Sequence, residues 1–180
     1  MVAPELWQVF DATGRPINGY GEVAEKFAID DSLLMANSHL WLWRDYDTSR
    51  HILLQTRARH LPRKPGYFHA SASGHVNLGE SAKQAVLREA QEELGAVLQP
   101  SRVRELFMLR GGPRMESFNY VFSCQFDESI KLRINEAEVD HTDWVSLEVF
   151  AEMTQNPDKY KLINLGNEYF ERLIAQLKTL

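Results

Sequence analysis

The chain has one cysteine, Cys124, in 180 residues, which excludes an internal disulfide and a multi-cysteine zinc site. Long hydrophobic runs are missing too: the uncharged run at 32–43 has 12 residues, too few and too polar to span a bilayer. The first residues lack a basic cluster and carry Glu5 where a signal peptide would be apolar. These absences predict a soluble, cytoplasmic protein without a membrane segment.

The composition is otherwise that of an ordinary folded protein. Charged residues make up 25% of the chain and hydrophobic residues 44%, which excludes a wholly disordered polypeptide. The length suits one domain with its own core, and no repeat or linker is visible, so we expect a single domain over residues 1–180. The net charge of −5 argues against bulk binding to nucleic acid.

The net charge hides an uneven distribution along the chain. Residues 48–79 contain five basic residues and no acid, whereas residues 80–93 contain four glutamates and two basic residues. Residues 94–115 are basic again, and residues 116–180 are acidic. A basic segment followed by a compact acidic one suits an anionic substrate together with a metal cation, although charge alone fits a plain solvated surface better.

Hydrophobic patterning predicts a mixed α/β fold. Strands are predicted at 6–10, 39–44, 51–56, 103–109, 118–126 and 143–145. A helix is predicted to begin near Glu80 and Ser81 and to end at Gly95. A last helix is predicted because apolar residues recur at i, i+3, i+4 and i+7 from Phe170. Strands on both sides of a central helix, with another helix at the end, indicate a layered α/β fold.

An acidic stripe runs along the first of these helices. Each residue advances about 100° around a helix axis, which places Glu89, Glu92 and Glu93 side by side next to an apolar stripe. Three such carboxylates repel one another unless a cation lies there, and their oxygens suit Mg²⁺ or Mn²⁺. Arg88 lies at the edge of the stripe and can pair with one carboxylate. Gly74 allows a tight turn, which can point a backbone carbonyl towards the same cation site.

The segment 74–96 resembles the Nudix box, a specific 23-residue motif. Its fixed positions are all present at the motif's spacing: Gly74, Glu80, Arg88, Glu89, Glu92, Glu93 and Gly95. Two soft departures are Ala90 and Ala96, where bulkier aliphatic residues are usual. Flanking segments at 53–57, 64–68, 138–139 and 143–145 also resemble the family, so the resemblance spans about residues 39–149.

The resemblance implies an α/β/α sandwich with a mixed β-sheet. It also implies Mg²⁺-dependent (or Mn²⁺-dependent) hydrolysis of a pyrophosphate bond in a nucleoside diphosphate linked to a moiety X, or in a related phosphorylated metabolite. The implied metal ligands are Glu89, Glu92, Glu93 and the Gly74 carbonyl. In the same resemblance, Glu80 orients or neutralises the site and Arg88 pairs with a carboxylate of the motif.

The motif does not fix the general base. The candidates are Glu92, Glu116, Glu136 and Glu138. Outside the motif Glu138 is favoured because it shortly precedes Trp144, although an exposed loop explains Glu136 and Glu138 equally well.

Several further side chains are candidates for contacts with substrate. Phosphate contacts are expected from Arg57, Arg63, Lys64, Arg110 and Arg114, each of which fits a solubilising role as well. Candidates for stacking on a substrate base are Trp41, Trp43, Tyr67 and Phe68, although aromatic residues on strands more often belong to the core. His69 and His75 flank the glycine turn and are expected to be hydrogen-bonding loop residues rather than ligands.

Two other functions stay open. Segments 5–11 and 73–80 resemble isopentenyl-diphosphate isomerase, but that enzyme uses a cysteine where this chain has Ser73, and Cys124 is expected to be a core residue. A ligand sensor without turnover is the second alternative, although sensors of this fold usually lose the carboxylates retained here. The expected partner is a small phosphorylated substrate, such as a nucleoside triphosphate, dinucleotide, nucleotide sugar or isoprenoid diphosphate. A homodimer is left open.

Overall fold

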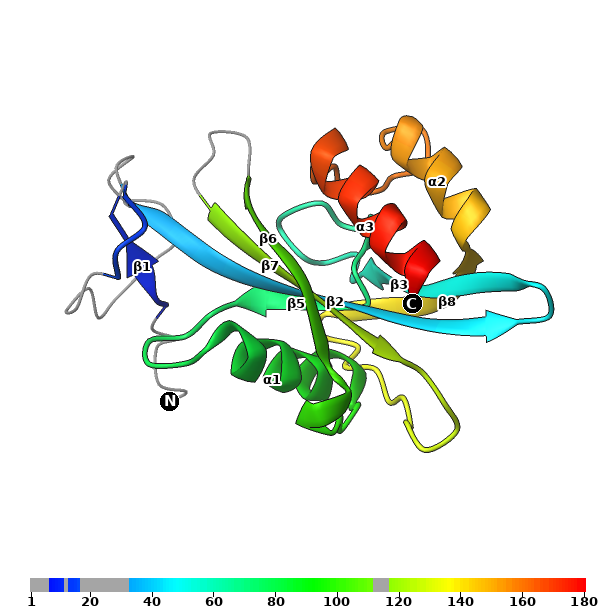
Figure 1. The fold of residues 1–180 in the computed structure, drawn as a ribbon, viewed down its shortest axis with the longest axis horizontal. Coiled ribbons are helices and arrows are strands. Elements are labelled where there is room, and N and C mark those ends of the chain that lie inside the picture. Colours follow the sequence, from blue (N-terminus) through cyan, green and yellow to red (C-terminus); the bar gives the residue numbers. More distant parts are fainter. Residues whose placement is uncertain (1–6, 12, 17–32, 112–116) are drawn as a thin grey trace.

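The computed structural model describes residues 7–11, 13–16, 33–111 and 117–180, and it shows a β-sheet with helices on both faces (Figure 1). The strands are β1 Val9–Phe10, β2 Leu34–Tyr46, β3 Ser49–Arg57, β4 Phe68–His69, β5 Ala72–His75, β6 Arg104–Gly111, β7 Ser117–Gln125 and β8 Val139–Ser146. The helices are α1 Ala82–Leu94, α2 Leu147–Gln155 and α3 Asn167–Thr179, with a 3₁₀ turn at Pro100–Arg102. Among these described helices none is long and apolar enough to cross a membrane.

The sheet is mixed and centred on β2. The main strand order is β4-β3-β2-β7-β6; β1 and β5 also pair with β2, and β8 pairs with β3. The pair β2–β7 is parallel, whereas β2 pairs antiparallel with β1, β3 and β5. The edge of β2 opposite β7 has three partners: β1 lies along residues 34–35, β5 along residues 37–40 and β3 along residues 43–46. Helix α1 covers one face, and α2 and α3 cover the other (Figure 1). The predicted sandwich with a mixed sheet is therefore confirmed.

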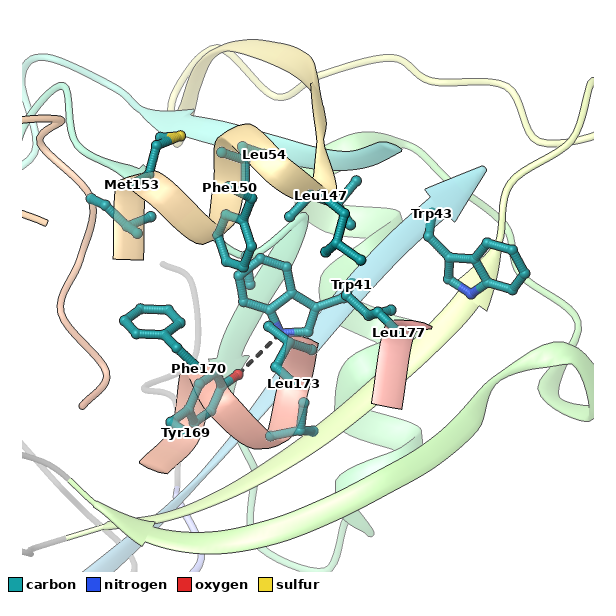
Figure 2. Close-up of a cluster of buried hydrophobic side chains, with 14 residues drawn as sticks. Trp41, Trp43, Leu54, Leu147, Phe150, Met153, Tyr169, Phe170, Leu173 and Leu177 are labelled. Atoms are coloured by element: carbon teal, nitrogen blue, oxygen red, sulfur yellow. Dashed lines mark hydrogen bonds between the residues drawn. The ribbon is translucent and has the colours of Figure 1, made fainter. Parts of the chain in front are cut away.

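Side chains of β2 alternate between two cores, as the period of a strand requires. Leu40 and Leu42 pack with the apolar stripe of α1. Trp41 and Trp43 pack with α2 and α3 in the cluster of Figure 2. Both tryptophans are buried, so they are core residues and do not form a platform for a base. Cys124 is buried in the α1-side core, also as expected.

Most predicted elements are present, and those that sequence analysis missed are short. The strands predicted at 39–44, 51–56, 103–109, 118–126 and 143–145 correspond to β2, β3, β6, β7 and β8, with β2 and β8 starting earlier than expected. The strand predicted at 6–10 is described only from Trp7 on and is reduced to β1. Strand β5 was missed because its sequence, ASGH, has no apolar alternation, and α2 because it begins directly at the end of β8.

Candidate active site

Helix α1 begins and ends at residues that define its register. Ser81 is the N-cap and forms a capping box with Gln84, and Gly95 ends the helix in the left-handed conformation at φ 63°. An added Cβ at Gly95 would lie 2.7 Å from the Arg133 carbonyl oxygen, so glycine is required there for two reasons. These signals fix where α1 begins and ends, and its apolar stripe packs against the sheet.

The acidic stripe of α1 divides into a buried and an exposed part. Glu89 and Glu93 lie against the sheet with 7% and 4% of their surface exposed. The side chain of Glu92 is half-exposed and turned outwards to Arg88. Two carboxylates of the motif are thus desolvated together, which is unfavourable for two negative charges without a counter-ion.

Glu93 reaches into the sheet between β3 and β5. Its Oε2 accepts hydrogen bonds from the backbone N–H of Ser73 on β5, at 2.7 Å, and from Nε2 of Gln55 on β3, at 3.1 Å. Burial raises the pKa of Glu93 to about 8, and the charges of Glu89 and Glu138 add to this, against the hydrogen bonds from Ser73 and Gln55. A carboxyl with this pKa binds a proton near neutral pH unless another cation replaces it.

Arg88 joins the carboxylates of the motif. Its Nη1 lies 2.7 Å from Glu89 Oε1 and 2.8 Å from Glu92 Oε2. Its Nε and Nη2 each lie 3.1 Å from an oxygen of Glu80, and Nη2 also donates to the His75 carbonyl at 2.9 Å. Burial lowers the pKa of Arg88, but the hydrogen bonds and charges of these glutamates outweigh it and raise the pKa. Glu80 in turn accepts the Asn77 N–H, which fixes the turn before the helix.

The absence of a side chain at Gly74 leaves room for the Glu89 carboxylate against β5. A Cβ at position 74 would lie 1.9 Å from Glu89 Oε1 and 2.1 Å from its Cδ, so a larger residue would displace the carboxylate. The backbone of Gly74 therefore lies in contact with a buried carboxylate, in agreement with the expected neighbourhood of these two residues.

The oxygen atoms of this site fit a hard divalent cation, although they do not form a complete metal-binding group. Within the described ranges no three His, Cys, Asp or Glu side chains come together as a metal-binding group. Two buried carboxylates, Glu89 and Glu93, are nevertheless present, and beside them Oε1 of Gln55 is buried without a hydrogen-bond partner. Oxygen atoms of carboxylate and amide groups are what Mg²⁺ and Mn²⁺ prefer, with waters and phosphate oxygens completing the shell.

Among the described candidate bases outside the motif, Glu138 is the one that interacts with Glu93. Its charge acts on the pKa of Glu93, and its Oε1 accepts a hydrogen bond from Asn135 Nδ2 at 2.9 Å. Glu136 is exposed on the same loop. Glu116 lies outside the described residues.

The expected phosphate-binding residues fall into two groups. Arg57 is the last residue of β3, and Arg63 and Lys64 lie in the loop that follows it. Arg57 Nε donates to the Arg63 carbonyl, and Lys64 Nζ lies 4.5 Å from the centre of the Tyr67 ring. Arg110 is on β6, at the far edge of the sheet, with β7 between it and β2, so it does not join them. Arg114 lies outside the described residues.

Two contacts to Glu93 were not foreseen from the sequence. The signal for Gln55 is a polar residue inside the apolar run of β3, and the signal for Ser73 is its position directly before Gly74. His69 forms a hydrogen bond as expected, with Nδ1 2.7 Å from Ser73 Oγ, but it lies on strand β4 and not in a loop. His75 stacks on Trp7 with ring centres 3.5 Å apart.

Known proteins resemble this chain in fold and in part of the sequence. Nudix hydrolase 3 of Arabidopsis thaliana is 30% identical over 70 residues, a match that covers 39% of this chain and 9% of that protein. Among solved structures, DR0079 from Deinococcus radiodurans aligns with a TM-score of 0.68 at 17% identity, over 95% of this chain and 98% of the other.

Two further structural neighbours were determined with or named for nucleotide ligands. The NUDIX domain of Shewanella oneidensis NrtR, complexed with ADP ribose, has a TM-score of 0.58 at 19% identity and covers 81% of this chain and 87% of its own. A binary complex of the C. elegans Ap4A hydrolase has a TM-score of 0.56 at 16% identity and covers 82% and 100%. At these identities the likeness establishes the fold. Since the NUDIX domain model matches residues 41–165, more than half of the chain, this protein belongs to the NUDIX domain family.

Proposed function

We propose that the protein is a divalent-metal-dependent hydrolase that cleaves a pyrophosphate bond in a nucleotide derivative. The observation that carries this proposal is the pair of buried carboxylates, Glu89 and Glu93, which lie together at the glycine of an intact motif. Family membership and the relative named a Nudix hydrolase support the reaction class. Because the chain covers 9% of that relative, its substrate does not transfer to this protein.

Glu89 and Glu93 would hold Mg²⁺ or Mn²⁺, with the Gly74 carbonyl, the unpartnered Oε1 of Gln55 and Glu92 as further oxygen ligands. The bound cation supplies charge neutralisation on the phosphate oxygens and on the leaving group. Arg88 and Glu80 keep the carboxylates in register through the hydrogen bonds described above.

The hydrolytic step needs a base and an anion-binding surface. Glu138 takes a proton from the attacking water as the oxygen–phosphorus bond forms and the bridging phosphorus–oxygen bond breaks. Arg57, Arg63 and Lys64 supply positive charge for the substrate phosphates from the end of β3 and the loop after it. This division of roles separates metal binding, on α1, from base catalysis, on the loop before β8.

A screen that identifies the hydrolysis products by chromatography tests the proposal, because cleavage of a dinucleotide or nucleotide sugar yields two phosphate esters and no free phosphate. The compounds are nucleoside triphosphates, dinucleotides including Ap4A, nucleotide sugars, ADP ribose and isoprenoid diphosphates, each with Mg²⁺ and with EDTA. On any substrate found, Glu93→Gln is expected to lower the rate on the order of 10²–10⁴-fold, because it removes an ionised ligand. Glu171→Gln, an exposed glutamate on α3, is the matched control and is expected to retain the wild-type rate.

The alternatives predict different results in the same screen. An isomerase would rearrange isopentenyl diphosphate without phosphate release, but Cys124 is buried in the core and position 73 is a serine. A sensor would bind a nucleotide with no turnover. Metal-dependent hydrolysis that survives both Glu89→Gln and Glu93→Gln would refute the proposed site.

A further inference from the structure

The two donors to Glu93 come from strands that share a partner. Ser73 is on β5 and Gln55 is on β3, and both strands pair with the same edge of β2, β5 along residues 37–40 and β3 along residues 43–46. The Glu93 carboxylate thus bridges β5 and β3, which follow one another along this edge of β2. Its position depends on how far apart Ser73 and Gln55 are held.

His69, on β4, lies beside the same two donors. By strand register His69 is the partner of Gln55, and its side chain reaches across to Ser73, with Nδ1 2.7 Å from Ser73 Oγ. Ser73 therefore makes two hydrogen bonds: its backbone N–H donates to Glu93, and its hydroxyl is bonded to His69. His69 is the residue that connects both donors of the carboxylate.

A buried chain of hydrogen-bonded side chains ends in a ring contact with His69. Trp41 Nε1 donates to Tyr169 Oη at 3.0 Å (Figure 2), and the same hydroxyl lies 2.8 Å from Nδ1 of His39. The His39 ring lies edge-on to His69, with ring centres 5.4 Å apart. Burial lowers the pKa of both histidines, so the two rings are neutral and do not repel each other at physiological pH.

We propose that His69 is a positioning residue for Glu93: through the hydroxyl of Ser73 it holds the backbone N–H of β5 at the distance from Gln55 that the carboxylate needs to bind a divalent cation. The inference rests on the proposed function, because it assigns Glu93 to a metal site. Residues that hold a metal ligand from behind typically contribute about 10- to 100-fold to metal affinity.

Mn²⁺ binding to the full chain, measured by electron paramagnetic resonance of the free ion, tests the inference without any substrate. Ser73→Ala keeps the N–H to Glu93 but removes the bond to His69, and His69→Leu removes the same bond from the other side. Each is expected to weaken Mn²⁺ binding about tenfold or more. Ser73→Thr keeps the hydroxyl and is expected to restore wild-type affinity.

Ser71→Ala is the matched control. Ser71 is buried between β4 and β5, accepts the Leu42 N–H at 2.8 Å and donates to the Leu53 carbonyl at 2.6 Å. Its removal is expected to lower the melting temperature and to leave Mn²⁺ affinity unchanged.

Equal weakening in the Ser71→Ala and Ser73→Ala proteins, or Mn²⁺ affinity of Ser73→Ala within twofold of wild type, would overturn the inference. Ser73→Ala decides the matter even where His69→Leu fails to fold. A wild-type protein that binds no Mn²⁺ would refute the proposed metal site and the role of His69 together, whereas wild-type binding with unaffected variants refutes only the role of His69.

Discussion

Glu93→Gln is expected to stabilise the metal-free protein in alkaline solution. Burial raises the pKa of Glu93 from 4.5 to about 8, so the folded chain keeps its proton at a pH where the unfolded chain has lost it. As pH rises through this window, ionisation favours the unfolded chain, and the loss of stability is complete above the folded pKa. A shift of this size corresponds to on the order of 5 kcal/mol at most.

Glu93→Gln removes this pH dependence and keeps the oxygen that accepts from Ser73 and Gln55. Urea unfolding in EDTA at pH 5 and pH 9 measures the effect: wild type is expected to lose several kcal/mol between the two, and the variant much less. The control Glu171→Gln, on the exposed face of α3, should follow wild type. Parallel pH dependence in wild type and Glu93→Gln would show that the buried carboxylate is not what destabilises the apo protein. Adding Mn²⁺ at pH 9 should stabilise wild type and leave Glu93→Gln nearly unchanged.

Two further substitutions follow from contacts. Gly74→Ala is expected to displace the Glu89 carboxylate, because the new Cβ would lie 1.9 Å from its Oε1. Metal-dependent hydrolysis should fall on the order of 10²-fold or more, with the circular dichroism spectrum unchanged. A fully active variant would contradict the assignment of Glu89 to the metal site. Tyr169→Phe leaves the Trp41 N–H without its acceptor and is expected to reduce the free energy of unfolding by about 1–3 kcal/mol in urea titration. No loss there would mean that the N–H finds another partner.

The sequence is enough to predict helix α1 and its acidic stripe. It does not predict which strand residues contact those glutamates. Ser81 and Gly95 are local signals, and the spacing of the glutamates follows from helix geometry alone. Which glutamates are buried depends on the strands that α1 packs against, and the sequence pattern did not reveal β5. The donors to Glu93 come from residues 20 and 38 positions away, a separation at which side-chain periodicity says nothing.

Arg88 illustrates the same limit. The motif predicted that it pairs with one carboxylate, and the structure adds that it bonds three glutamates and the carbonyl of His75. Those additional contacts arise because the turn after β5 returns to the start of the helix, which is a property of the folded chain.

The parallel pairing of β2 with β7 has a consequence for how the protein folds. Strand β3 joins β2 by a tight turn and can pair with it early, whereas β7 has to return from beyond α1 to lie beside the same strand. Contacts between distant segments slow folding, because the intervening loop must be closed before they form. We therefore expect the pairing of β2 with β7 to form late in folding, and a nascent chain shorter than 125 residues to lack the complete strand that pairs with this edge of β2.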